Sequence, residues 1–188
     1  MNWNEHYNLE GKHAFIGASS HSWLNYTPDK LRQVYLTNLK KQKGTELHLF
    51  ASMAIKNRLK MAPLKKALNM FVNDAIGFGM RSEQVLYYSD NCFGTADAIL
   101  FKDGQLRIHD LKTGDLPVKK FGQLDIYAAL FCLEYGYDPY KMTFVTRLYQ
   151  GREAREEIPS PDDIHGIMMK ITQFDKILDN LEETMKEE

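Results

Sequence analysis

The chain has 188 residues, which suffices for one domain with a substantial core and no disulfides. Hydrophobic residues make up 44% and charged residues 26%, a balance that excludes disordered, collagen-like and fibrous proteins. No apolar run reaches the roughly 18 residues of a membrane span. The first residues also lack the basic-then-apolar order of a secretory signal, so we expect a cytoplasmic protein. The two cysteines, Cys92 and Cys132, are too few for a disulfide framework, a structural zinc or an iron–sulfur cluster.

The net charge of −1 hides an uneven distribution. Residues 1–150 carry 19 basic and 14 acidic side chains, whereas residues 151–188 carry 5 basic and 11 acidic ones. Ten of the basic residues lie between Pro28 and Lys66. Folded onto one surface, they would form a patch large enough for a polyanion. They could equally be solvated lysines on the outer faces of helices, and the patch alone does not decide between the two.

Helices are predicted first along the chain. Thr27 followed by Pro28 is typical of a helix start, and this helix is expected to end near Lys41. A second helix is expected from about Gly44, and a third over Pro63–Gly77, because apolar residues recur there at helical spacing.

The period then changes to that of strands. Three strands are predicted over Arg81–Ser89, Phe93–Lys102 and Gln105–Lys112. Asp103-Gly104 joins the last two, and this dipeptide is the strongest short-range signal for a two-residue hairpin turn. The chain should therefore reverse tightly at this point.

A strongly apolar helix is predicted over Lys119–Tyr135, followed by strands at Lys141–Tyr149 and Ala154–Ile158. Ser160-Pro-Asp-Asp then predicts the cap of a final amphipathic helix. We expect its apolar stripe to face the core rather than a partner; it consists of Ile164, Ile167, Met168, Ile171, Phe174, Ile177, Leu178 and Leu181.

This order of elements predicts an α+β fold. A small, mostly antiparallel or mixed sheet of four or five strands is expected at its centre, with helices around it. One domain should span residues 1–188, with a basic helical part at about 1–80, a sheet core at about 81–158 and a final helix at about 160–187.

The hairpin register brings two acids together. If Lys102 faces Gln105 across the turn, the same register places Asp97 directly opposite Asp110 on the neighbouring strand. Strand alternation gives this face a core character that turns acidic at one end, with Phe93, Thr95, Ile99, Phe101, Leu106, Ile108 and Lys112 on the same side.

Two facing carboxylates repel each other unless a cation lies between them. Oxygen ligands suit Mg²⁺ or Mn²⁺, and Lys112 on the same face is placed to hold a water nucleophile or a developing anion. In the alternative interpretation, the three residues form a surface ion cluster in which Lys112 only neutralises two exposed acids.

These residues resemble a known family. Gly94-Thr-Ala-Asp97, a hairpin and then His109-Asp-Leu-Lys-Thr-Gly114 are similar to the core of the PD-(D/E)XK nucleases, in particular the RecB-like exonuclease branch. Gly44-Thr-Glu-Leu-His48 and Gln123-Leu-Asp-Ile-Tyr127 match two further motifs of that branch in the family's order. The resemblance covers nearly half of the chain and extends, more loosely, to the opening stretch of standalone phage-type members.

The resemblance implies a restriction-endonuclease-like core and a role for each matched position. Asp97 and Asp110 would be metal ligands, with His48 completing the metal site, and the backbone carbonyl of Leu111 would also reach the metal. Lys112 would be the catalytic lysine of the motif, and Gln123 and Tyr127 would lie on a helix beside the cleft. His109 points to the other face of its strand and is expected to be structural.

The implied activity is Mg²⁺- or Mn²⁺-dependent hydrolysis of DNA phosphodiester bonds at DNA ends, with one or two ions, in recombination, repair or phage DNA processing. The host would be a bacterial or phage-infected cell. Neither an iron–sulfur cluster nor a nucleotide is expected, because the chain has too few cysteines and no P-loop pattern. Backbone phosphates would be held without sequence readout by Lys40, Lys41, Lys43, Lys119 and Lys120.

Other functions stay open at this point. The same residues would suit a non-catalytic module that binds DNA ends, a structure-specific endonuclease or a nuclease that acts on RNA. Homo-oligomers and a recombination partner protein are also compatible with the sequence.

Overall fold

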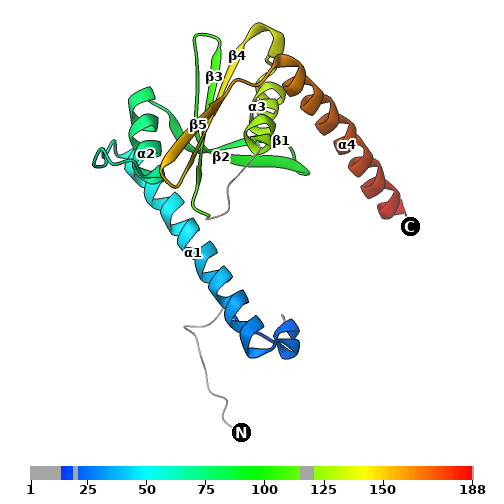
Figure 1. The fold of residues 1–188 in the computed structure, drawn as a ribbon. Coiled ribbons are helices and arrows are strands. Elements are labelled where there is room, and N and C mark those ends of the chain that lie inside the picture. The colour runs from blue at the N-terminus through cyan, green and yellow to red at the C-terminus, as the bar shows by residue number, and fades with distance from the viewer. Residues whose placement is uncertain (1–13, 19–20, 115–120, 188) are drawn as a thin grey trace, which may run out of the picture. The chain divides into compact units, whose positions relative to one another are not determined.

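The structure is a computed structural model that describes residues 14–18, 21–114 and 121–187 (Figure 1). The chain divides into two compact units, Met1–Lys43 and Gly44–Glu188. The matched motif residues from His48 to Tyr127 all belong to the second unit. Among the described residues, no helix combines the length and the apolar character that a membrane span requires.

The first unit contains the 3-10 helix η2, His21–Asn25, and the beginning of α1, Pro28–Lys56. The Thr27 hydroxyl accepts a hydrogen bond from the Lys30 amide at 3.2 Å, which confirms the predicted helix cap. Trp23 Nε1 donates to the Gly17 carbonyl at 2.9 Å and thereby ties η2 to the segment before it.

The predicted break between two helices near Gly44 is wrong, because α1 continues for 29 residues. A Cβ atom on Gly44 would lie 2.8 Å from the Thr113 hydroxyl oxygen. Glycine is needed here for this close approach, at the cost of some helix stability, and does not end the helix.

The second unit is built on a five-stranded mixed sheet in the order β1-β2-β3-β4-β5 (Figure 1). Its strands are β1 Arg81–Ser89, β2 Cys92–Lys102, β3 Gln105–Lys112, β4 Thr143–Gln150 and β5 Glu153–Glu157. Only β3 and β4 pair in parallel; the chain passes between them through α3, Gly122–Tyr135, and the short 3-10 helix η3, Pro139–Lys141. The α+β class and the predicted strands are therefore confirmed.

The predicted hairpin is also confirmed. Asp103 has φ 51° and Gly104 has φ 74°, the positive angles that a type I′ turn requires at both central positions. Lys102 pairs with Gln105, as the turn predicts.

Helices cover both faces of the sheet. Leu106 and Ile108 of β3 belong to the cluster of buried residues beneath α3 and the start of α4, Pro161–Glu187. Leu111 belongs to the second cluster, beneath the end of α1 and α2, Ala67–Phe78. The two faces of β3 thus pack into different hydrophobic clusters.

Helix α2 begins at Ala67, four residues later than predicted. The Asn73 side chain accepts a hydrogen bond from the Met61 amide at 2.8 Å and donates one to its carbonyl at 3.0 Å. Asn69 donates to the Ala62 carbonyl at 2.9 Å. These side chains satisfy backbone groups of the preceding segment, which bends and stays outside the helix.

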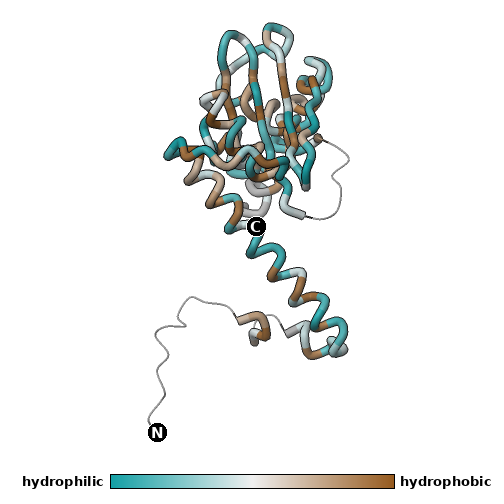
Figure 2. Tube along the Cα trace, turned by 60° about the vertical axis from the view of Figure 1, so that its left-hand side comes forward, coloured by the Kyte–Doolittle hydropathy of each residue, from teal (hydrophilic) through white to brown (hydrophobic). Residues whose placement is uncertain are grey.

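The final helix starts as predicted but is only partly core. Ser160 caps it by accepting a hydrogen bond from the Asp163 amide at 3.1 Å. Apolar positions recur along its whole length (Figure 2). Ile164 is fully buried, yet the later stripe residues are about half exposed, namely Phe174, Ile177, Leu178 and Leu181. The prediction that the whole stripe faces the core is therefore wrong, because the packing against the sheet and α3 ends near Ile171.

His109 lies on the α2 side of the sheet, away from the two acids, as predicted. Its ring is fully buried, and its Nδ1 lies 3.1 Å from the Tyr149 hydroxyl. Tyr149 donates in turn to Asp74 at 2.7 Å, and Arg147 donates to the same carboxylate oxygen at 3.0 Å. This network ties β3 and β4 to α2.

Replacing His109 with glutamine should reduce the loss of stability in acid. Burial lowers the pKa of His109 from 6.5 to about 3. The unfolded chain therefore binds a proton below about pH 6.5 that the folded chain refuses until about pH 3, so stability falls as the pH falls through this window. Between about pH 7 and pH 5 the native chain should lose about 2 kcal/mol more than His109→Gln, as measured by urea unfolding at both pH values. Equal losses would show that the folded histidine is already protonated.

Candidate active site

Asp97 lies where the pairing of β2 with both neighbouring strands is interrupted. The β1–β2 register pairs Ser82 with Ala98 and Gln84 with Ala96, and it omits Asp97. The β2–β3 ladder ends at Ala98 and His109. The predicted cross-strand pair of Asp97 and Asp110 therefore does not form, because the ladder stops one step short of it.

The alternation of side chains between the two faces of β2 is broken at Asp97, so residues before and after it follow different alternation patterns. Ala96 and Ile99 both belong to the cluster beneath α3, whereas Ala98 belongs to the cluster on the α2 side. The predicted core face is consequently right at Ile99, Phe101, Leu106 and Ile108. It is wrong at Thr95, which is exposed, and at Phe93, whose exposed fraction is 62%.

The Asp97 carboxylate replaces the missing backbone pairing. Its Oδ2 accepts a hydrogen bond from the Leu111 amide at 2.8 Å, and its Oδ1 lies 3.2 Å from His48 Nδ1. One side chain thus connects β2, β3 and α1. The hydrogen bond to Asp97 raises the pKa of His48 above its usual value, although burial opposes this shift.

Asp110 is a buried acid with one oxygen left without a hydrogen bond. Its exposed fraction is 2%, and Lys112 Nζ donates to its Oδ1 at 3.1 Å. Lys112 Nζ also lies 2.9 Å from Oδ2, but outside hydrogen-bond geometry, so this buried oxygen accepts no hydrogen bond from the described residues. Burial, and next the charge of Asp97, raise the pKa of Asp110. A cluster of exposed acids neutralised by Lys112 does not describe this arrangement.

Helix α3 holds the lysine through a chain of polar contacts. Lys112 Nζ donates to Gln123 Oε1 at 2.6 Å, and Gln123 Nε2 donates to the Tyr127 hydroxyl at 2.9 Å. The ring of Tyr127 lies over Gly94, where an added Cβ atom would be 2.9 Å from Tyr127 Cε1. Gly94 thus leaves the space that lets Tyr127 reach these contacts.

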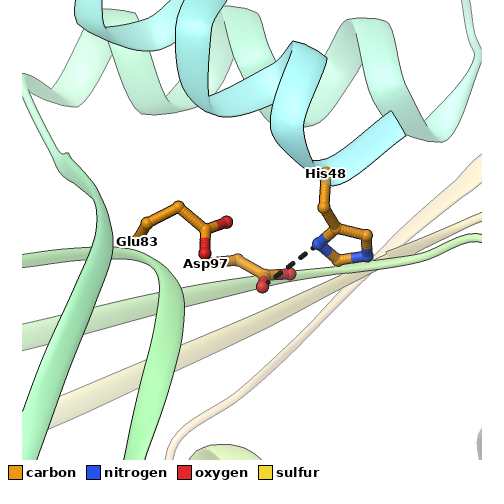
Figure 3. A group of neighbouring side chains, drawn as sticks. All are labelled: His48, Glu83 and Asp97. Carbon is orange, nitrogen blue, oxygen red and sulfur yellow. Dashed lines mark ion pairs between the residues drawn. The ribbon is translucent and has the colours of Figure 1, made fainter. Parts of the chain in front are cut away.

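Glu83 joins the site although no pattern in the sequence selects it. One ligand atom each from His48, Glu83 and Asp97 lie within 4.8 Å of one another (Figure 3). Burial and then the charge of Asp97 raise the pKa of Glu83, and its φ of 52° places this residue in the left-handed region. An N/O group of this kind can hold a divalent cation.

A local irregularity explains why Glu83 was missed. Ser89 pairs with Cys92 across the β1–β2 turn, but the register shifts between Tyr87 and Ser89. Extrapolated from the turn alone, the register would place Gln84 opposite Asp97. The shift instead brings Glu83 to that position, and such an irregularity leaves no clear signal in the sequence.

For the other predicted residues that the structure describes, it gives a position but no contact that tests the predicted role. Leu111 pairs with Tyr149 in the β3–β4 ladder, and the role of its carbonyl stays a prediction. Lys40, Lys41 and Lys43 lie on α1 within the first unit. Lys119 and Lys120 fall outside the described residues, so nucleic-acid binding by these five lysines also stays a prediction.

Comparison with known proteins gives a family without an activity. The family model described as "Protein of unknown function (DUF2800)" matches residues 80–173, which is half of the chain. The match includes Glu83, Asp97, Asp110 and Lys112 and leaves out His48. No curated protein matches the chain.

Replacing Glu83 with glutamine should weaken the binding of Mn²⁺ by about tenfold or more, because the cluster would lose one charged oxygen ligand. Isothermal titration calorimetry with Mn²⁺ alone measures this change. Glu46→Gln is the matched control, because Glu46 is an exposed acid two residues from His48 and outside the cluster. Equal affinities of the two variants would exclude Glu83 as a ligand.

Proposed function

Because the chain belongs to this DUF2800 family, whose description names no activity, we propose a function from the chemistry of the site. The protein is a metal-dependent nuclease of the PD-(D/E)XK superfamily that resembles the RecB-like exonucleases. It hydrolyses phosphodiester bonds at DNA ends. The preference for ends over internal sites rests on the family resemblance alone.

One observation carries this proposal: the separate motifs meet in one connected cluster. His48 contacts Asp97, and Asp97 bonds the amide next to Asp110. Asp110 holds Lys112, which contacts Gln123 on α3. Residues from α1, β2, β3 and α3 thus form one contact chain, which is the kind of constellation that a catalytic site needs.

The residues present fit a divalent cation. His48, Glu83 and Asp97 offer the oxygen and nitrogen ligands that Mg²⁺ or Mn²⁺ accepts, and Asp110 lies outside this group of three. The buried Asp110 Oδ2 accepts no hydrogen bond from the described residues, although Lys112 Nζ lies 2.9 Å from it, so this oxygen keeps lone pairs that a divalent cation would use. When bound, such an ion would supply Lewis-acid polarisation of the phosphate and of the attacking water.

Lys112 has the clearest task among the side chains. An ammonium group has three donors, and the described contacts with Asp110 and Gln123 use two of them. The third donor is left for the attacking water or for the charge that develops on the phosphate. Gln123, held by the Tyr127 hydroxyl, fixes the direction of this lysine.

Cleavage assays with paired substitutions on one hairpin test the proposal. Asp110→Asn and Lys112→Gln should each lower the rate of DNA cleavage about a hundredfold or more, because each removes a charge from the reacting centre. The matched controls are Asp103→Asn and Lys102→Gln, which make the same changes at the far end of the hairpin. Asn also tolerates the positive φ at position 103.

Linear, nicked, circular and single-stranded DNA and RNA are each incubated with Mg²⁺, Mn²⁺ or EDTA. Metal-dependent release from DNA ends supports the proposal. Binding of DNA ends without cleavage under any metal would support a non-catalytic module instead. Cleavage of circular DNA or of RNA would change the proposed substrate class. Full activity in both Asp110→Asn and Lys112→Gln would contradict the assignment of the active site.

A further inference from the structure

A polar pocket of about 480 Å³ lies between the C-terminal ends of α1 and α2 and the first residues of β1. Three basic side chains, Lys56, Arg58 and Arg81, line it together with Glu83. We call it the basic pocket. Its volume lies within the range of about 300–1,000 Å³ that is usual for small-ligand sites.

The basic pocket borders the candidate metal cluster. Glu83 lines the pocket, and its carboxylate also belongs to the group formed with His48 and Asp97. Lys56 is close enough for its charge to lower the pKa of Glu83, against the larger effect of burial. An anion in the pocket would therefore be next to whatever the cluster binds.

Two residues of the pocket adopt a backbone conformation that side chains disfavour. Only Arg58, Glu83 and Asp103 have positive φ among the described residues other than glycine, and Asp103 is explained by its turn. Arg58, at φ 53°, and Glu83, at φ 52°, both line the pocket. Arg58 takes this conformation at the end of α1, where its amide bonds the Ile55 carbonyl and the Leu59 amide bonds the Ala54 carbonyl. Of these three residues, only Glu83 therefore has a positive φ that no turn or helix end explains, and such strain gathers at functional sites.

Within the protein, the effects of these three positive charges include that of Lys56 on the pKa of Glu83. One carbonyl near the end of each helix is already bonded, since Ile55 O accepts from the Arg58 amide at 3.0 Å and Ile76 O from the Gly79 amide at 3.2 Å. In the part of the chain that the structure describes, Lys56, Arg58 and Arg81 form no ion pair with an acid. Three cations around one concave space attract an anion.

We propose that the basic pocket binds a phosphate group of the nucleic-acid strand, adjacent to the phosphate that is cleaved. This inference rests on the proposed nuclease function. Arginine guanidinium groups bind phosphate oxygens in pairs, and a lysine adds a point charge. Glu83 repels a phosphate unless a divalent cation offsets its charge, so phosphate binding in the pocket and cation binding at the cluster favour each other.

Three charge-removing variants test the pocket: Lys56→Gln, Arg58→Asn and Arg81→Gln. Asn at position 58 suits the positive φ, so the variant removes the charge without adding strain. Lys102→Gln on the hairpin is the control, and thermal melting confirms that each variant folds. Binding of labelled oligonucleotides is followed by fluorescence anisotropy with Mg²⁺ in an Asp110→Asn background, which prevents cleavage.

Each pocket variant should bind DNA several-fold more weakly than the control. Binding should also become less sensitive to salt. The negative slope of log affinity against log salt concentration should become shallower by about 0.7 to 0.9 for each phosphate that the variant no longer neutralises. In the cleavage-competent background the same variants should raise KM by a larger factor than they lower kcat. Oligonucleotides with and without a terminal phosphate show whether the pocket takes an end or an internal phosphate, and either result supports it.

The outcomes separate this inference from the proposal it rests on. If the native chain cleaves DNA and the pocket variants bind it like the control, the basic pocket is not a phosphate site although the nuclease stands. A further outcome is that inorganic phosphate binds in the pocket while the pocket variants keep the oligonucleotide affinity of the control. The phosphate that the pocket takes would then not belong to a nucleic-acid strand, and the inference fails. If the native chain neither cleaves nor binds DNA, both fail together.

Discussion

The site depends on the carboxylate of Asp97, which accepts a backbone hydrogen bond where strand pairing is missing. Asp97 lies where the β2–β3 ladder ends and one pair is missing from the β1–β2 ladder. Its carboxylate accepts a hydrogen bond from the Leu111 amide and contacts His48. A gap in a sheet normally leaves polar groups without partners, and this side chain fills the gap. The break in side-chain alternation, the place of Glu83 and the approach of α1 all occur around this residue. The constraint is therefore local in space although it joins three elements of the fold, β2, β3 and α1.

Burial gives the site its electrostatic character. Asp110 is almost completely buried, and the nearby charge of Asp97 adds to the effect of burial in raising its pKa. Acids gathered in this way reduce folding stability, and Lys112 offsets only part of the cost. The divalent cation that we propose at His48, Glu83 and Asp97 would reduce this repulsion.

Strand β3 shows how one segment serves two purposes. Asp110 and Lys112 contribute to the site beneath α3, while His109 and Leu111 between and beside them hold the opposite face to α2 and α1. The buried residues His109 and Tyr149, with the partly exposed Asp74, form a network that fixes the strand on its α2 side. Gly44 lets α1 approach the end of the same strand at Thr113, which brings the helix that carries His48 to the acids. Rigid packing on one face thus positions the polar groups on the other.

The sequence by itself determined the features that depend on short-range chemistry. Asp103-Gly104 set the hairpin, Thr27 and Ser160 set two helix caps, and the spacing of Asp110 and Lys112 placed them on one face, because turns, caps and strand alternation act over a few residues. Only the tertiary structure decided that Glu83 belongs to the site, that α1 continues through Gly44 and that the last part of α4 stays exposed. A one-residue shift in strand pairing, a contact between distant segments and the end of a packed core each depend on residues far apart in the chain, so no local pattern encodes them.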